Sequence, residues 1–357
     1  MISLKEALEK EYIFDPDFKK KVKINFDKVA KPLDSLGKFE DMLAKIGAIE
    51  GKEIPDLDKA VLTVFAADNG IIAEGVSQSD HTVTSACAKN IAAYRSTAGI
   101  FAKRAGADIK VIDMGIKDEI DYESTKIINK KVACATRDFV YEPAMTKNEV
   151  IKALEIGINL AFDLKNEGYK VICLGEMGIG NTTTSSALCA ALLHLNAKEV
   201  TGRGAGLSDQ GLEKKIMVID HAINKYDLYD KDPLTTLQYV GGLDIAGMTG
   251  MIIGAALSRI PIILDGLISL TAALIAKKIC KKNIENFVIG SHVGKERATK
   301  LLLSELGIEH IISADLALGE GTGALLCLEM LKTVNMVLDQ TIKFNESTIE
   351  QYSRFEK

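Results

Sequence analysis

The sequence predicts an α/β protein: a doubly wound, mainly parallel sheet with helices on both faces, plus a small helical subdomain from the chain ends. Between residues 51 and 324, short apolar runs alternate with longer amphipathic stretches, as in a parallel sheet with crossover helices. Residues 1–50 and 325–357 have helical patterns and no strand-like run. We therefore expect a large α/β domain over 51–324 and a small helical subdomain formed by 1–50 and 325–357.

The predicted strands are short and almost continuously apolar, which is typical of strands that are covered on both faces. They are AVLTVFAA (60–67), DIKVIDMG (108–115), YKVICLGE (169–176), IPIILDG (260–266), NFVIGSH (286–292) and HIISAD (310–315).

Helical periodicity fills the intervals between these strands. Apolar residues recur at Val150, Leu154 and Ile158 in the segment 147–168, and similar patterns cover 181–195 and 295–307. The last of these segments ends at Gly307, a residue suited to a helix C-terminus. The longest apolar stretch, 247–276, is interrupted by Arg259, Pro261 and Asp265, so it lacks the roughly 20 uncharged residues of a membrane span. It predicts a buried helix, strand and helix instead.

The composition is that of an ordinary folded protein with mixed charge. Hydrophobic residues make up 47%, charged residues 26%, and the net charge is −5. This balance argues against nucleic acid or a membrane surface as the main partner. The N-terminus lacks the apolar core of a signal peptide, and the six cysteines have neither CxxC nor metal-ligand spacing. We expect reduced, mostly buried thiols and a cytoplasmic location.

Polar residues gather after the predicted strands, where ligands bind in parallel α/β sheets. The segments are DNGIIAEGVS (68–77), MGIGNTTTSS (177–186), DGLIS (265–269), SHVGKE (291–296) and LALGEGTGA (316–324). Because the carboxyl ends of parallel strands share one edge of the sheet, this pattern predicts a single site there.

Three glycine-rich segments each allow a functional and a structural interpretation. GEMGIGNTTT (175–184) suits a phosphate at a helix N-terminus, but it also fits a tight turn capped by Asn181 or a threonine. TGRGAGLSD (201–209), followed by Lys214 and Lys215, resembles an anion-binding nest, although a flexible loop is the simpler interpretation. GGLDIAGMTGMIIGAA (241–256) predicts close helix packing, with Asp244 as an N-terminal cap.

Glu320 and Glu176 are the carboxylates best placed for chemistry, since each lies at the end of a predicted strand beside glycines. Burial raises the pKa of a carboxyl group toward neutrality, which suits a general base. The five histidines form no metal-ligand pair, and no GxSxG or Walker sequence is present. The residues alone therefore indicate an α/β enzyme that acts on a phosphorylated small molecule by acid–base chemistry.

Seven segments in one order resemble the nicotinate-nucleotide–dimethylbenzimidazole phosphoribosyltransferase family. They are KPLDSLGKFE (31–40), EGVSQSDHTVT (74–84), GEMGIGNTTTSSAL (175–188), GGLDIAGMTG (241–250), LDGLIS (264–269), SHVGKE (291–296) and LGEGTGA (318–324). The resemblance implies transfer of phosphoribose from nicotinate mononucleotide to a benzimidazole, which supplies the lower ligand of cobamides. It also implies a homodimer that uses no metal or organic cofactor.

The resemblance implies a role for individual residues. Glu320 matches the catalytic base and Glu176 the second active-site glutamate. The phosphate and nucleotide would be held by Gly178, Gly180, Asn181, Thr182, Thr183, Lys215, Ser291, Gly319 and Gly321, and the base by Ser79, Cys87, Met177 and Leu318.

The sequence departs from the family pattern around the base. After the first strand the family usually has Asp-His-Gly, whereas this chain has Asn69 in place of the histidine. Cys87 stands where a longer side chain is common. The acceptor could therefore be dimethylbenzimidazole, another benzimidazole, a purine or a phenol. A catalytically weak relative that binds the nucleotide or the base as a sensor or partner subunit is the alternative. A dinucleotide-dependent oxidoreductase is excluded, because no GxGxxG follows the first strand.

Overall fold

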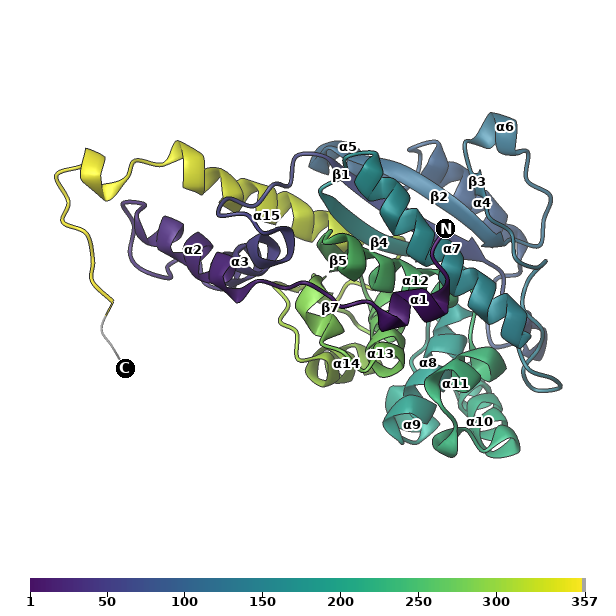
Figure 1. The fold of residues 1–357 in the computed structure, drawn as a ribbon. Coiled ribbons are helices and arrows are strands. Elements are labelled where there is room, and N and C mark those ends of the chain that lie inside the picture. The colour runs from purple at the N-terminus through teal and green to yellow at the C-terminus, as the bar shows by residue number, and fades with distance from the viewer. Residues whose placement is uncertain (355–357) are drawn as a thin grey trace.

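The computed structural model describes residues 1–354 and confirms the predicted α/β class (Figure 1). Six strands form a parallel sheet in the order β3-β2-β1-β4-β5-β6. Their bounds are β1 Ala60–Ala67, β2 Ala107–Gly115, β3 Ile128–Asn129, β4 Val171–Met177, β5 Ile262–Leu264 and β6 Val288–Gly290. The strand order reverses between β1 and β4, and a ligand crevice is expected at that point in a doubly wound sheet.

The predicted strand at 310–315 is wrong as a member of this sheet. Only Ile312–Ser313 (β8) is extended, and it pairs with His292–Val293 (β7) in a separate two-stranded sheet. The N–H groups of Ile311 and Ile312 both donate to the carbonyl oxygen of Ser291, at 3.2 and 3.1 Å. This chain segment is therefore held at the break between β6 and β7, beyond the end of the main sheet.

The edge strand β3 was not predicted. It has two residues, Ile128 and Asn129, which pair with Ile112 and Asp113 of β2. So short a strand, followed by Lys130 and Lys131, has no apolar run from which it could be recognised.

Alternate strand residues enter two separate hydrophobic cores, as a doubly wound sheet requires. Val61 and Phe65 of β1 belong to one core, whereas Leu62 and Val64 belong to the other. Helices α12 (Leu243–Ser258) and α13 (Leu267–Cys280) cover the first face, and α7 (Lys147–Asn166) packs on α12. Helices α4 (Thr82–Ala92), α5 (Thr97–Ala105) and α15 (Thr322–Gln340) cover the second.

The remaining helices include two of the predicted segments. They are α6 Tyr122–Thr125, α8 Asn181–Leu193, α9 Ala197–Val200, α10 Asp209–Tyr226, α11 Pro233–Val240 and α14 Ala298–Leu306, with 3₁₀ turns η1 Gly70–Glu74, η2 Leu228–Asp230, η3 Ile284–Phe287 and η4 Phe344–Glu346. The C-terminal cap at Gly307 is confirmed by its φ of 65°.

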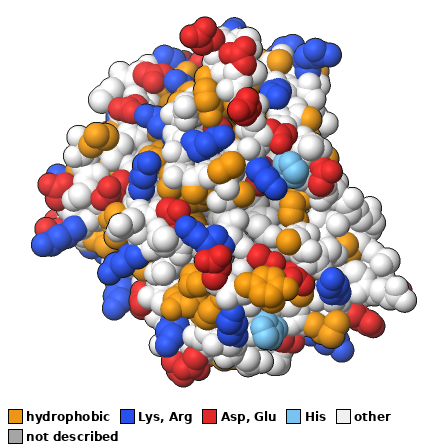
Figure 2. Space-filling model, turned by 90° about the vertical axis from the view of Figure 1, so that its right-hand side faces the viewer, with side chains coloured by type: hydrophobic (Ala, Val, Ile, Leu, Met, Phe, Trp, Pro, Cys, Tyr) orange, Lys and Arg blue, Asp and Glu red, His pale blue; other side chains and the backbone are white. Residues whose placement is uncertain are grey.

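None of the helices described is both long and apolar enough to cross a membrane. On the face shown in Figure 2, acidic and basic side chains are interspersed.

Glycines allow α7 and α12 to pack backbone against backbone, as the small residues of α12 predict. A Cβ atom added at Gly250 would overlap with the carbonyl oxygen of Leu154, and one added at Gly254 would overlap with that of Ile158. Only glycine fits at these two positions. Close helix packing therefore accounts for part of the 241–256 segment.

Helices from the N-terminal and C-terminal parts of the chain meet at one side of the molecule, although the two termini lie far apart (Figure 1). Helices α2 (Pro16–Asp27) and α3 (Lys38–Glu50) pack on each other, and α15 contacts α3. Helix α1 (Leu4–Glu9) lies elsewhere, on α7 and α12. The division into domains at residues 50 and 325 remains a prediction, and residues 355–357 of its C-terminal part lie outside the described residues.

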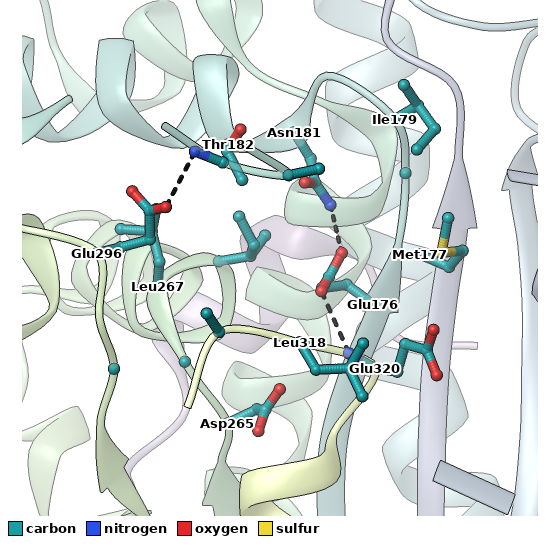
Figure 3. Close-up of a pocket in the computed structure, with 18 of the residues that line it drawn as sticks. Glu176, Met177, Ile179, Asn181, Thr182, Asp265, Leu267, Glu296, Leu318 and Glu320 are labelled. Atoms are coloured by element: carbon teal, nitrogen blue, oxygen red, sulfur yellow. Dashed lines mark hydrogen bonds between the residues drawn. The ribbon is translucent and has the colours of Figure 1, made fainter. Parts of the chain in front are cut away.

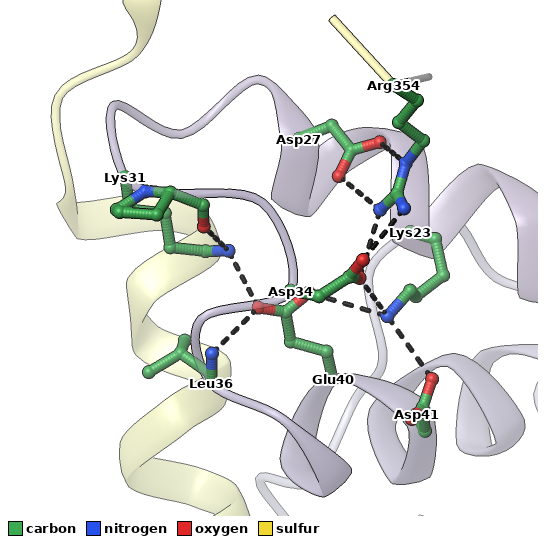
Figure 4. Close-up of polar contacts among 9 residues, drawn as sticks. Lys23, Asp27, Lys31, Asp34, Leu36, Glu40, Asp41 and Arg354 are labelled. Carbon is green, nitrogen blue, oxygen red and sulfur yellow. Dashed lines mark hydrogen bonds and ion pairs between the residues drawn. The ribbon is translucent and has the colours of Figure 1, made fainter. Parts of the chain in front are cut away.

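A polar network braces this helical region (Figure 4). The fully buried carboxylate of Glu40 accepts from Lys31 Nζ at 2.7 Å and from the N–H of Leu36 at 3.1 Å. Near the C-terminus, the guanidinium of Arg354 bonds to the carboxylates of both Asp27 and Asp34. The network therefore ties the C-terminal segment to the connection between α2 and α3.

Candidate active site at the carboxyl edge of the sheet

A cleft of about 1080 Å³, its open mouth included, lies at the carboxyl ends of β4 and β5 (Figure 3). Its walls come from the loops after these strands and from segments 76–78, 203–207, 292–296 and 316–320. Segments that are distant in the sequence thus converge at the sheet edge where the polar residues were expected.

Nine of the predicted site residues line this cleft. They are Glu176, Met177, Gly178, Gly180, Asn181, Thr182, Leu318, Gly319 and Glu320. The other six, which do not line it, are Ser79, Cys87, Thr183, Lys215, Ser291 and Gly321. Lys215 and Ser291 are fully buried behind its wall. Cys87 lies close enough to Glu320 for that charge to raise the pKa of its thiol, in addition to the larger effect of burial.

Glu320 lies in the loop that leads into α15. Its φ of 59° is left-handed, which is uncommon for a residue with a Cβ atom and indicates a backbone held by its surroundings. Its Oε2 atom is buried and has no hydrogen-bond partner. Burial, followed by the charge of Asp265, raises the pKa of the carboxyl group. A carboxylate with a free oxygen and a raised pKa can accept a proton from a bound ligand.

The neighbouring Leu318 does not bury this carboxylate. Its side chain is 53% exposed and forms part of the cleft wall.

Glu176 belongs to a cluster of buried carboxyl groups at the end of β4. Asn181 donates its side-chain N–H groups to Glu176 Oε2 and to Asp244 Oδ2, the latter at 3.1 Å. Burial raises the pKa of Glu176 to about 8 and that of Asp244 to about 7. Glu176 Oε1 accepts from the N–H of Glu320 at 3.4 Å, so the two glutamates are in direct contact.

The sequence interpretation of Asp244 as an N-terminal cap is wrong. Gly242 occupies the N-cap of α12, and Asp244 lies in the first turn with its side chain turned to Asn181. The prediction failed because the helix begins at Leu243, directly after Gly241 and Gly242 and before the aspartate.

The turn before α8 has the geometry of an anion site. Gly180 has a φ of 96°, and Asn181 follows it as the first residue of the helix. The N–H groups of Asn181, Thr183 and Thr184 bond to the carbonyl oxygens of Gly178 and Gly180, so the turn offers an anion chiefly the positive end of the helix dipole. Lys215, on α10, donates from Nζ to Thr182 Oγ1 at 2.8 Å. Burial lowers the pKa of Lys215 to about 8, while the charge of Glu296 opposes that shift.

The second glycine-rich segment, 201–209, lies next to the ammonium group of Lys215. A Cβ atom added at Gly204 would lie 2.8 Å from Thr182 Oγ1 and 3.5 Å from Lys215 Nζ. The turn 178–182 and the loop 202–206 therefore form one cradle rather than two.

Glu296 was missed as a site residue. Its Oε1 accepts from the N–H of Gly204 at 3.0 Å, and its buried Oε2 has no partner (Figure 3). The carboxylate lies so close to Gly202 that any side chain there would overlap with it. The segment SHVGKE contained the only sequence signal for this residue, since it follows a strand at the ligand edge.

Asn69, which departs from the family pattern, lies behind the turn. It is 1% exposed, its Nδ2 donates to the carbonyl oxygen of Ile179 at 3.4 Å, and its Oδ1 accepts from Thr184 at 3.4 Å. The amide thus supports the turn from beneath and does not line the cleft.

Within residues 1–354, no group of three or more His, Cys, Asp or Glu side chains is arranged to hold a metal ion. The features that are present are a cradle for an anion, a pair of contacting glutamates and a cleft at the switch point of a doubly wound sheet. They define an α/β enzyme that acts on a small anionic substrate by acid–base chemistry.

Similarity to known proteins assigns this enzyme to a family. The family model described as phosphoribosyltransferase (DBI_PRT) matches residues 13–349. The nicotinate-nucleotide–dimethylbenzimidazole phosphoribosyltransferase of Acetivibrio thermocellus is 40% identical over 331 residues, covering 93% of each chain. That of Ruminiclostridium cellulolyticum is 36% identical over 355 residues, 99% of this chain and 100% of its own.

The fold agrees with that assignment. The crystal structure of CobT from Thermus thermophilus is similar with a TM-score of 0.88 at 30% identity, covering 94% of this chain and 100% of that one. The chain belongs to the nicotinate-nucleotide–dimethylbenzimidazole phosphoribosyltransferase family.

Proposed function

We propose that this protein transfers phosphoribose from nicotinate mononucleotide to 5,6-dimethylbenzimidazole or a related base, for assembly of the cobamide nucleotide loop. The names of its relatives specify the nucleotide and the base. The observation that carries the proposal is Glu320, whose free, buried carboxylate oxygen lies beside an anion cradle in one cleft.

The chemistry is a single displacement at C1′ of the ribose. One nitrogen of the benzimidazole forms a bond to C1′ while Glu320 accepts the proton from the other nitrogen. The bond from C1′ to the nicotinate nitrogen breaks, and its electron pair neutralises the pyridinium ring as it departs. The configuration inverts from β to α, and the step balances without a metal ion or an organic cofactor.

Glu176 lines the cleft, and a positively charged nicotinate ring bound beside it would lower its raised pKa and favour the ionised carboxylate, with Asp244 behind it. Both carboxyl groups are buried and share Asn181 as their donor. We assign this cluster to holding the pyridinium form of the substrate. When the ring leaves without charge, that attraction ends, which favours its release.

The phosphate belongs in the cradle of Gly178, Gly180, Thr182 and Lys215. The positive end of the α8 dipole lies at this turn, and Lys215 supplies the positive charge. Thr183, Ser291, Gly319 and Gly321 then act as supports of the cradle and of the Glu320 loop.

The acceptor base belongs between Met177 and Leu318, on the side of Cys87 and Ser79. Apolar walls of this kind discriminate between bases that differ by one methyl group by only about 1–3 kcal/mol. We therefore expect the enzyme to use more than one base.

The test is a product assay with nicotinate mononucleotide and, separately, dimethylbenzimidazole, benzimidazole, adenine and p-cresol. We expect an α-riboside phosphate and an equal amount of nicotinate with at least the first base. Glu320→Gln should lower kcat about 100-fold or more, since a positioned general base contributes on the order of 10²–10⁴. Glu305→Gln, at an exposed position of α14, is the matched control.

Two outcomes would contradict the proposal. Near-normal turnover by Glu320→Gln would remove the assigned base. Absence of product with every base, from folded protein that still binds the nucleotide, would favour the sensor or partner-subunit alternative.

We further propose that the protein is a cytoplasmic homodimer, as the family resemblance implies. Multi-angle light scattering of the purified protein should give about twice the chain mass of 38.7 kDa. A mass equal to one chain at micromolar concentration would contradict the dimer.

A further inference from the structure

Asp265 has no assigned role, although it lies in the floor of the cleft. It follows β5 directly, and its side chain is 3% exposed. Its Oδ1 accepts from the N–H groups of Gly323 and Ala324 at 2.7 and 3.3 Å, and its Oδ2 accepts from that of Gly321 at 3.1 Å. One carboxylate thus holds three backbone donors at the start of α15.

The first of these donors, Gly321, directly follows Glu320 in the chain. On its other side, the N–H of Glu320 itself donates to Glu176 Oε1 at 3.4 Å. The left-handed backbone of Glu320 is therefore held between two carboxylates, one from β4 and one from the end of β5. A strained conformation persists only where the surroundings impose it, and Asp265 supplies three of the bonds that hold the segment directly after Glu320.

Asp265 also changes the electrostatic field at Glu320. Glu320 precedes the N-cap of a helix of 19 residues, and the positive end of a helix normally lowers the pKa of a nearby carboxyl group. Yet the pKa of Glu320 is raised, first by burial and then by the charge of Asp265. Asp265 occupies free N–H groups of that helix end and adds a negative charge of its own.

The charge of Asp265 is not cancelled by its neighbours. Burial raises its pKa, whereas His292 and the three N–H groups act in the opposite direction. Three N–H donors on the two oxygens favour the ionised form, because each of them stabilises negative charge on the carboxylate. His292 Nδ1 lies 3.9 Å away, but burial lowers the pKa of that imidazole and keeps it neutral.

We propose that Asp265 is the positioning residue of the active site: its bonds to the N–H groups of Gly321, Gly323 and Ala324 fix the backbone of Glu320, whose carboxylate accepts the proton of the incoming base. This rests on the proposed function of Glu320. Besides Asp265, Glu176 from β4 and Cys87 from α4 lie next to Glu320, and His292 from β7 lies next to Asp265.

The decisive variant is Asp265→Asn, assayed for kcat as a function of pH with saturating substrates. The acid limb, where Glu320 becomes protonated, should move to lower pH by about one unit, the lower end of charge effects on a pKa. The plateau should fall about tenfold or more, because the base is weaker and its loop has lost a bond. The Kd for nicotinate mononucleotide should change by less than about threefold, since its cradle is formed by other residues.

A second variant separates charge from geometry. Asp265→Glu keeps the charge but cannot place both oxygens on the same three donors, so its plateau should fall while the acid limb stays near that of the unaltered protein. It also provides the test if Asp265→Asn does not fold. Asp113→Asn is the matched control: this carboxylate is equally buried at the end of β2 and accepts from Ile116 N–H and Tyr122 O–H.

The outcomes are distinguishable. An unchanged acid limb in Asp265→Asn, or a limb moved equally by Asp113→Asn, would overturn the proposal. A kcat that falls together with nucleotide affinity would reduce Asp265 to a structural role. Normal turnover by Glu320→Gln would instead overturn the assigned base, whatever the Asp265 variants do.

Discussion

The buried carboxyl groups of the site lower the stability of the folded protein when they ionise. Glu176 and Asp244 share one amide donor, and Asp244 Oδ1 has no partner. A pKa raised by burial means that the folded state binds a proton more tightly than the unfolded chain does. Ionisation of either group in the ligand-free cleft therefore destabilises the fold.

This gives a prediction for stability as a function of pH. The pKa of Glu176 is about 8 in the fold against 4.5 for an ordinary glutamate, so its contribution to stability is full below about pH 4.5 and is lost as the pH rises through 8. Glu176→Gln should remove that loss. Between pH 5 and pH 9 the free energy of unfolding of this variant should fall by on the order of 4 kcal/mol less than that of the unaltered protein, since each pH unit below the pKa of about 8 contributes about 1.4 kcal/mol.

The measurement is urea unfolding of the ligand-free protein at both pH values. Glu305→Gln serves again as an exposed control and should follow the unaltered protein. Equal pH dependence in Glu176→Gln and in the unaltered protein would contradict the prediction. Asp244→Asn should act in the same direction, because burial raises the pKa of Asp244 to about 7.

At the residue scale, the sequence identified groups that are marked by their position. Glu176 ends a predicted strand, Glu320 follows one, and both stand beside glycines, so they could be selected before any contact was known. Asp244, Asp265 and Glu296 could not be assigned in the same way. Their importance comes from contacts with residues that are 56 to 92 positions away, such as the 3.0 Å bond from Gly204 to Glu296.

At the scale of elements, helices α7 and α12 pack backbone against backbone. The two helices meet at Gly250 and Gly254, where the opposing backbone leaves no room for a side chain. Their separation is therefore set by the absence of Cβ atoms, and α12 in turn covers β1, β2 and β4.

Gly250→Ala should consequently destabilise the protein by about 3 kcal/mol, the upper part of the usual range for overpacking, because the new methyl group meets backbone rather than a mobile side chain. Thermal unfolding measures the effect. Gly211→Ala is the matched control: it also lies in a helix, α10, but an added Cβ would meet only side-chain atoms of Leu207 and Ser208 at 3.0 Å or more. Equal melting temperatures for the two variants would contradict the packing argument.

Long elements were predictable and short ones were not. The apolar runs of β1, β2 and β4 are continuous, and both faces of the sheet are covered, so sequence and structure agree there within two residues. Strand β3 and the pair β7–β8 have two residues per strand. Their pairing is decided by tertiary hydrogen bonds, such as those to the Ser291 carbonyl, and not by a local pattern.

For the whole molecule, the fold class followed from the alternation of strands and helices, but the strand order did not. The order depends on pairing between segments that are far apart in the chain, such as Ala60 of β1 with Val171 of β4, and no local signal encodes that choice. The site edge could be predicted nonetheless, because all parallel strands end on the same side. The contacts that each loop makes with other loops could not be predicted.

Helix α15 joins the two regions of the molecule mechanically. It starts one residue after Gly321, next to Glu320, and its 19 residues make a rod roughly 28 Å long that contacts α3 (Figure 1). No loop interrupts it, so it can bend little. A displacement of α3 would therefore move α15 as a rigid body and, with it, the Glu320 carboxylate. Substitutions in α3 can then alter catalysis although α3 contacts no substrate.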